Sequence, residues 1–161
     1  MSGFLDQFRN KVLFSLRKDQ ARQEREVAVD DKIALGVLLW VVAQADDRFL
    51  PEEKEKIEDI LRNYAKISEK DMPVILASIE QAEKERIDLH TFTREVSHGL
   101  SYPTKVEITE LLFRLACVDG DLAHEEHEQI RQIAGLFQID HKDFINAKIK
   151  VKKESGMDTV D

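Results

Sequence analysis

Apolar residues recur at intervals of three and four along most of the chain, the spacing typical of helices that bury one face. Leu35, Leu38, Leu39 and Val42 follow this rhythm, and it returns near residues 57–64, 108–115 and 130–137. No segment alternates apolar and polar residues as a half-buried strand would. The pattern predicts an all-α protein of seven or eight helices, over residues 3–24, 29–45, 51–65, 69–86, 89–99, 103–117, 124–137 and 141–149.

Local start signals support several of these helices. Pro51 precedes two glutamates, Ser68 precedes Asp71 by three residues, and Pro103 opens a further apolar stripe. The longest apolar run, over residues 33–45, has the length of a buried core helix and is too short to cross a membrane. We therefore expect a helical bundle with no membrane-spanning segment.

The chain also repeats itself at a distance of 73 residues. Nine of the 23 positions from 38 to 60 are identical to their counterparts, where average composition predicts about one or two. The identical pairs are Leu38/Leu111, Leu39/Leu112, Ala43/Ala116, Asp46/Asp119, Glu52/Glu125, Glu53/Glu126, Glu55/Glu128, Ile57/Ile130 and Ile60/Ile133. Each unit comprises an apolar helix, an acidic loop and a second helix that begins with acidic residues. We therefore predict a bundle built from two helical hairpins related by a pseudo-twofold axis.

The repeated motif resembles the tellurite-resistance TerB family. It occurs as Ala43, Asp46, Asp47, Glu53 and Ile57, and again as Ala116, Asp119, Gly120, Glu126 and Ile130. The same helical module is similar to the N-terminal part of DjlA-type membrane-anchored co-chaperones, and the likeness covers about residues 29–149. It implies an all-α bundle in a bacterial cytoplasmic protein of stress or metal response, which binds divalent metal through its acidic loops. The sequence departs from the family pattern at Asp47, where glycine is usual, and at His124.

The two acidic loops are candidate cation sites. Their carboxylates suit hard cations such as Ca²⁺ or Mg²⁺ better than Zn²⁺, and the candidate ligands are Asp46, Asp47, Glu53, Asp119, Asp121 and Glu126. The spacing is not that of an EF-hand, because the twelfth position of each loop is isoleucine where a glutamate ligand is required. Glutamates in a first helical turn also stabilise the helix dipole and accept bonds from loop amides. Capping and cation binding therefore both explain these residues. Of the two loops, the one with Asp119 and Asp121 is the better metal candidate because it has one more carboxylate.

Three other side chains carry candidate chemistry. His124 and His127 stand three apart on one helix, a spacing that suits a transition metal, but we expect them to be solvated surface histidines. Cys117 ends an apolar helix beside an acidic loop. We expect a buried core thiol there, since free cysteine is among the most buried residue types.

Length, charge and cysteine content narrow the class of protein. The 161 residues suit one domain, and the net charge of −8 argues against nucleic-acid binding. One cysteine and no signal-peptide pattern favour the reducing cytoplasm. Residues 1–25 carry a charge of +3, which leaves −11 for residues 26–161. We divide the chain into a basic amphipathic helix over 1–25, a TerB-like domain over 26–150 and a frayed tail over 151–161.

These features lead to three hypotheses of function. The first is a non-enzymatic TerB-like module that binds a divalent cation and protein partners. The second is a membrane-peripheral adaptor or co-chaperone-like interaction domain, held at the inner membrane face by residues 1–25. Alternatively, the apolar stripe of residues 1–25 docks on the protein body or on a second copy in a homodimer. The third is a metal-dependent hydrolase, which requires carboxylates from both loops to converge.

Overall fold

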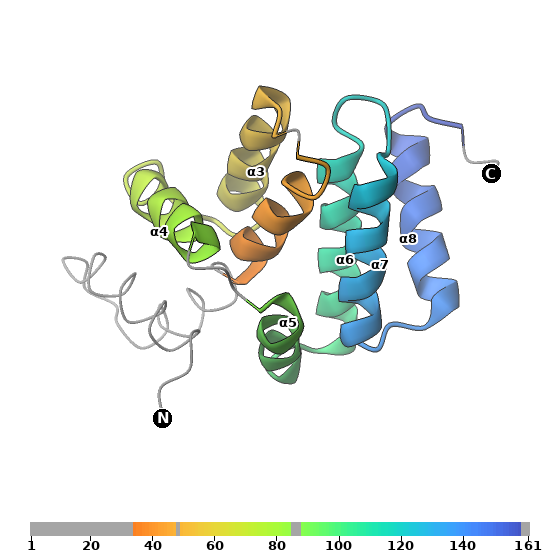
Figure 1. Cartoon of the computed structure of the whole chain (residues 1–161). Helices are drawn as coiled ribbons and strands as arrows, with labels where there is room; N and C mark the ends of the chain where they lie inside the picture. Colours follow the sequence, from red (N-terminus) through yellow and green to blue (C-terminus); the bar gives the residue numbers. More distant parts are fainter. Residues whose placement is uncertain (1–33, 48, 85–87, 159–161) are drawn as a thin grey trace.

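The computed structural model describes residues 34–47, 49–84 and 88–158, and these form seven helices with no strand (Figure 1). The first covers residues 34–43. The others are α3 (Pro51–Asn63), α4 (Met72–Lys84), α5 (Leu89–His98), α6 (Tyr102–Ala116), α7 (His124–Leu136) and α8 (His141–Glu154). The all-α prediction is therefore confirmed for this part of the chain. The helix expected over residues 3–24 lies outside the described residues.

Local sequence signals position the helix starts. Pro51 occupies the first turn of α3, where its missing N–H leaves no bond unmade. Ser101 precedes α6 and accepts a bond from the Thr104 amide at 3.4 Å, and Asp88 caps α5 by accepting one from the His90 amide at 3.1 Å. These caps account for the close agreement between expected and observed helix starts along α3, α5 and α6.

The C-terminal helix is longer than its sequence pattern predicts. We expected a helix over 141–149 and a tail that frays from residue 151, but α8 continues to Glu154. Val151 is fully buried, and Arg114 of α6 holds Glu154 through hydrogen bonds of 2.9 and 3.1 Å. Packing against α6 thus stabilises a final turn whose lysine-rich sequence shows no apolar stripe.

The internal repeat is present in the fold. Helices α3 and α7 begin and end 73 residues apart, and their buried positions correspond one to one: Glu53, Ile57, Ile60 and Leu61 in α3, and Glu126, Ile130, Ile133 and Ala134 in α7. The turns before them also match. The amides of Gln44 and Asp47 bond to Trp40 O and Gln44 O, as those of Cys117 and Gly120 bond to Phe113 O and Cys117 O.

Helix α6 lies at the centre of the second half of the molecule and packs against α3, α7 and α8, while α5 packs against α7 (Figure 1). In the first half of the molecule, the helix over 34–43 packs against α4. A Cβ added to Gly36 would lie 2.4 Å from the Cδ1 atom of Ile79, so glycine is what allows α4 to approach the helix over 34–43. The contact of α3 with α6 joins the two repeats and positions both acidic loops.

Candidate cation site at the junction of the repeats

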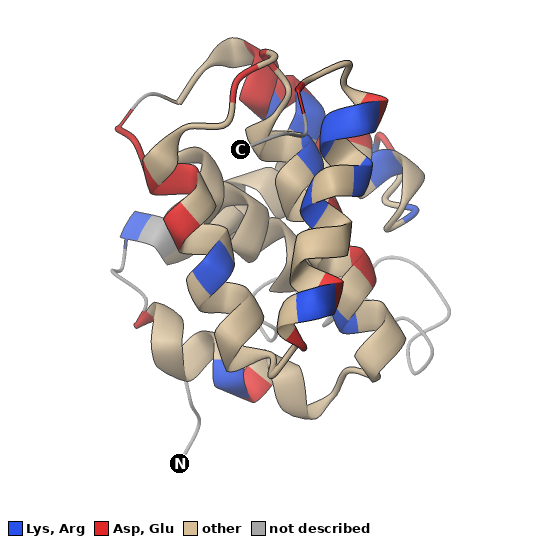
Figure 2. Cartoon of the chain, turned by 90° about the vertical axis from the view of Figure 1, so that its right-hand side faces the viewer, with Lys and Arg blue, Asp and Glu red and all other residues tan. Residues whose placement is uncertain are grey.

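The two acidic loops meet at one small cavity. Its volume is about 30 Å³, and its lining residues are Asp46, Leu50, Glu53, Ala116, Asp119, Asp121, Ala123 and Glu126. Both repeats contribute in matching positions, and five of the eight residues carry carboxyl groups. Figure 2 shows acidic residues gathered at the end of the molecule that carries these loops. The two loops therefore line one cavity rather than two separate ones, because the hairpins bring them together.

The backbone of each loop makes a left-handed turn just after the first aspartate. Asp47 has φ of 60° and Gly120 has φ of 85°. Aspartate tolerates this region better than most residues, so Asp47 can replace the glycine that the motif usually has. The turn leaves Asp47 exposed and outside the cavity lining, and it is the one predicted ligand that the structure does not bring to the site.

Glu53 and Glu126 form the buried floor of the site. Each is the third residue of its helix, and each is only 4% exposed. Glu53 accepts a hydrogen bond from the Leu50 amide through Oε1 at 3.0 Å, which is the capping role expected of this position. The Oε2 atoms of both glutamates are buried and accept a bond from no donor. Capping therefore explains one oxygen of Glu53 and leaves the second oxygen of each glutamate unexplained.

The two buried carboxyl groups perturb each other's ionisation. Burial raises the pKa of Glu126 to about 9, assisted by the adjacent carboxyl group of Glu53 and by the charges of Asp46 and Asp119. Burial also raises the pKa of Glu53, although the adjacent Glu126 carboxyl group and the bond from the Leu50 amide oppose that rise. With no cation bound, the pair therefore shares one proton at neutral pH, since two adjacent buried carboxylates repel each other.

The donor set fits a hard cation that keeps some of its water. Within the described ranges, no group of three or more Asp, Glu, His or Cys side chains is close enough to enclose an ion directly. A Mg²⁺ ion usually binds through one or two carboxylates and retains several waters, and Ca²⁺ also accepts water ligands. Two buried carboxylates with three aspartates around the cavity match that requirement. Zinc, which takes three or four direct protein ligands, does not match it.

The Asp119 side chain also fixes its own loop, because its Oδ1 accepts a hydrogen bond from the Asp121 amide at 3.1 Å. Asp119 and Asp121 are both exposed at the cavity edge, whereas Asp46 is half-buried. The two glutamates, by contrast, are buried in the first turns of α3 and α7.

The two histidines do not form a metal site with each other. His124 is exposed, but His127 is half-buried between the rings of Phe113 and Phe144, at centroid distances of 6.2 and 5.9 Å. Its Nε2 lies 3.3 Å from the Lys148 amine. The expectation of two solvated histidines is thus wrong for His127, which packs where α6, α7 and α8 meet.

Cys117 is a core residue, as its position at the end of an apolar helix predicted. It is 2% exposed, and burial raises the pKa of its thiol to about 11 despite the opposing charge of Lys152. A thiol with so high a pKa has little thiolate at neutral pH and is a weak nucleophile.

Leu50 and Ala123 are the lining residues that sequence reasoning missed. They are equivalent in the repeat and precede α3 and α7 directly. Neither carries a polar side chain, so no motif search would select them. The sequence signal that could have identified them is that they occupy equivalent positions, 73 residues apart, in the repeat.

The geometry defines a class of protein: a duplicated helical hairpin whose two acidic loops close over a shared pair of buried glutamates. The family model described as "Tellurite resistance protein TerB" matches residues 32–149, and the chain belongs to the TerB family. No curated protein and no solved structure shows significant similarity to the chain. None of the helices in the described part of the chain is long and apolar enough to cross a membrane.

Proposed function

We propose that this TerB-family protein is a binding module that takes one Ca²⁺ or Mg²⁺ ion at the junction of its two repeats. The observation that carries the proposal is the pair of buried oxygens, Glu53 Oε2 and Glu126 Oε2, which have no hydrogen-bond donor. Unpaired buried carboxylates are costly, and a cation or a proton relieves that cost. The cavity between the loops provides the space for a cation to do so.

Proton and cation compete for this pair. The pKa of Glu126, raised to about 9 chiefly by burial, means that the carboxyl group retains its proton at neutral pH when no ion is bound. An ion that binds both glutamates would release this proton, as metal binding does wherever a ligand must be deprotonated. The affinity of the site is therefore expected to increase with pH up to the range of this pKa.

The size of the cavity favours binding over catalysis. A volume of about 30 Å³ is close to the share of one water molecule in the liquid, so it accepts a single ion and excludes a substrate. Carboxylates from both loops do converge, as the hydrolase hypothesis requires. A two-metal centre, however, needs ions about 3.5–4 Å apart and an open position for substrate. We infer a non-enzymatic role.

The ion would join two halves of the molecule. Its ligands come from the loop before α3 and the loop before α7, so an ion between them stabilises one arrangement of the two hairpins. We propose that a protein partner recognises this arrangement and that the module acts in a stress response, as expected from its resemblance to the TerB family. The alternative of a membrane-peripheral adaptor depends on residues 1–25, which lie outside the described residues and add no support.

Calorimetric titration of the full chain with CaCl₂ and with MgCl₂ tests the proposal. We expect one ion per chain, and we expect Glu126→Gln and Glu53→Gln each to abolish binding. Asp47→Asn is the matched control, because Asp47 follows Asp46 directly but lies outside the cavity. Absence of binding down to millimolar affinity, or equal loss of binding in Asp47→Asn, would overturn the proposal.

Glu53→Gln also separates cation binding from capping. The amide oxygen of glutamine can still accept the bond from the Leu50 amide, so the cap is retained while the charge is lost. A variant that loses the ion but keeps the thermal stability of the ion-free protein supports a cation ligand. If no ion binds to the wild-type chain and only stability changes, capping alone accounts for the residue.

A further inference from the structure

Negative charge at the end of the molecule with the two acidic loops extends beyond the cation cavity. Residues 44–54 and 117–127 comprise both loops and the first turns of α3 and α7. They include eight acidic side chains and two basic ones, Arg48 and Lys54, so their formal charge is −6. We call the exposed carboxylates of this region the acidic face: Asp47, Glu52, Asp119, Asp121 and Glu125.

The acidic face has no basic side chain paired with it. None of its five carboxylates forms an ion pair with a lysine or arginine among the described residues. Elsewhere on the surface, arginines pair with several exposed carboxylates: Arg62 with Asp59 and Glu69, Arg131 with Glu128, and Arg114 with Glu154. Positive charge to balance the acidic face therefore has to come from solvent ions or from another molecule.

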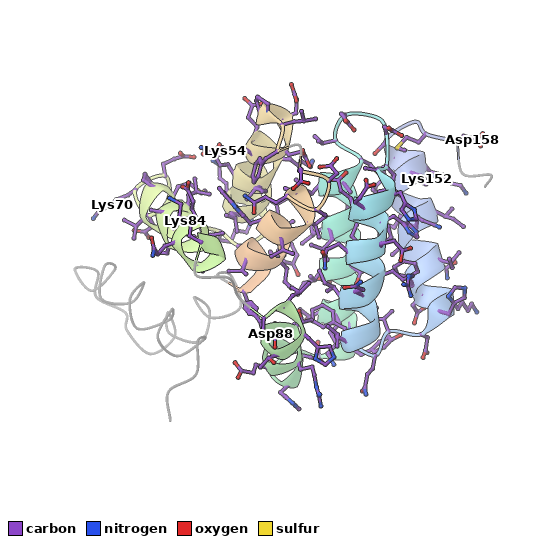
Figure 3. All side chains as sticks on the ribbon, viewed as in Figure 1. Lys54, Lys70, Lys84, Asp88, Lys152 and Asp158 are labelled. Atoms are coloured by element: carbon purple, nitrogen blue, oxygen red, sulfur yellow. The ribbon has the colours of Figure 1, made fainter. Side chains whose placement is uncertain are left out.

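The nearest lysines do not neutralise this region. Figure 3 shows Lys54 on the side of α3 turned away from α6, and Lys152 on the end of α8 that is level with the second loop. Lys56 lines a separate cavity on the other side of that loop. With Lys56 and Lys152 counted in full and a divalent ion between the buried glutamates, the charge is still −2. The helix dipoles cancel, because α3 and α7 begin here while α6 and the helix over 34–43 end here.

The buried pair beneath the acidic face also lacks a donor. Glu53 Oε2 and Glu126 Oε2 are buried without a hydrogen-bond partner, and both glutamates line the cavity that lies between the loops. Burial raises the pKa of Glu126 to about 9, and the charges of Glu53, Asp46 and Asp119 add to that rise. Carboxylates of the two loops are therefore close enough to repel one another. An ion or a proton satisfies the buried pair but leaves the five exposed carboxylates unpaired.

Apolar side chains lie among these carboxylates in the sequence of both loops. Phe49 and Leu122 are equivalent in the repeat, and each is half-buried, as are Leu50 and Ala123, which follow them. Lysine and arginine have aliphatic stems that pack on such positions while their charged ends stay in water. The ring of Phe49 can also contact a cation through its face. The surface therefore suits long basic side chains better than free inorganic ions.

We propose that a lysine- and arginine-rich segment of a protein partner binds across the acidic face, with its charged groups on the exposed carboxylates and its stems on Phe49 and Leu122. Such a segment is the class of partner that the proposed function leaves open, and the assignment rests on that function for the existence of a partner. Guanidinium groups pair with carboxylates through two parallel hydrogen bonds. Because the region stays negative with either a proton or an ion in the cavity, the segment binds in both states.

Calorimetric titration of the full chain with octa-arginine, at constant ionic strength, tests the proposal in chelator and again in MgCl₂. We expect saturable binding under both conditions, no binding of octaglutamate, and shifts of the Asp47, Gly120 and Glu125 amide signals in ¹H–¹⁵N spectra. The double variant Glu52→Gln/Glu125→Gln should weaken binding by about fivefold or more, as expected for the loss of two exposed ion pairs.

Glu80→Gln/Glu95→Gln is the matched control, because it removes the same charge from exposed positions far from the loops. Glu95 lies on α5, which leads into the start of α6, whereas the second loop follows the end of α6. Glu80 adjoins Ile79, which packs on Gly36 at the start of the helix over 34–43, whereas the first loop follows the end of that helix. We expect a change in peptide affinity of less than about twofold, since salt screens distant charges.

Two single variants separate this proposal from the cation site. Asp47→Asn should weaken octa-arginine binding by about twofold and leave one ion per chain, since asparagine also tolerates the left-handed turn. Glu126→Gln should abolish ion binding and retain peptide binding, because the buried pair already carries one proton when no ion is present. Non-saturable binding, equal losses in the two double variants, or amide shifts outside the two loops would overturn the basic-partner proposal. Absence of ion binding with peptide binding intact overturns the cation site alone.

Discussion

The two repeats have almost the same helical framework, but they place their equivalent glutamates in different electrostatic states. Glu53 has a backbone donor, the Leu50 amide, which offsets part of its burial. The pKa of Glu126 is raised to about 9, because burial, the adjacent Glu53 carboxyl group and the charges of Asp46 and Asp119 all act in the same direction. A duplication that preserved the residues therefore produced an unequal pair, in which the Leu50 amide donates a bond to Glu53 and no equivalent side-chain cap is seen for Glu126.

The two acidic loops also differ in the residues that they contain. The first contains Asp47 in the left-handed region, and the second contains Gly120 there, which removes a side chain from the turn. The second loop also contains Asp121, which reaches the cavity edge, whereas Asp47 does not. Each repeat thus supplies one buried glutamate, but the second supplies more of the aspartates. Equivalent positions in a duplicated fold therefore need not have equivalent chemistry.

Truncation of matched core residues should cause the largest effect and should be symmetrical. Ile57 and Ile130 are equivalent and both fully buried. We expect Ile57→Ala and Ile130→Ala each to lower the free energy of unfolding by about 2–5 kcal/mol, because each removes apolar contacts and leaves a cavity. Chemical denaturation measures both values. A loss below about 1 kcal/mol in only one variant would show that the two repeats are not packed alike.

The ionisation of Glu126 should cause the next largest effect. A carboxyl pKa raised from 4.5 to about 9 on folding means that the folded state binds more protons between these values. In chelator, the free energy of unfolding should therefore be highest below the unfolded pKa and should fall as pH rises toward 9. We expect a fall of more than about 1.4 kcal/mol, the equivalent of one pKa unit. Thermal denaturation at several pH values measures it.

Two variants test the origin of this pH dependence. Glu126→Gln should flatten it, whereas Glu125→Gln, at an exposed position in the same first turn, should leave it unchanged. Addition of Ca²⁺ or Mg²⁺ should reduce the fall in the wild-type chain and have no effect on Glu126→Gln. The same pH slope in wild type and Glu126→Gln would show that the buried pair does not control it.

The loop turns should give the smallest effects. Gly120→Ala places a Cβ in the left-handed region and should cost about 1 kcal/mol of stability. Asp47→Gly should change stability by less than about 0.5 kcal/mol, since relief of the backbone offsets the greater freedom of glycine in the unfolded chain. Thermal denaturation of both variants checks this. A loss in Asp47→Gly as large as in Gly120→Ala would indicate that the Asp47 side chain has a structural role.

The sequence predicted the elements well because its signals are local. Helical periodicity, Pro51 and Ser101 define where helices begin, and the 73-residue repeat predicted the matching hairpins. The candidate ligands were also recognisable, and five of the six lie at one cavity. The extension of α8 to Glu154 was not recognisable, because Val151 and Glu154 are held by contacts with α6 rather than by an amphipathic pattern.

By itself, the sequence determined the helices, the duplicated motif and the presence of acidic residues in each loop, because these depend on neighbours within a few positions. Only the tertiary structure decided that the two loops form one cavity and that Glu53 and Glu126 are buried together. Burial and the proximity of charges arise from contacts between distant segments. The ionisation of a carboxyl group therefore could not be read from residue types alone.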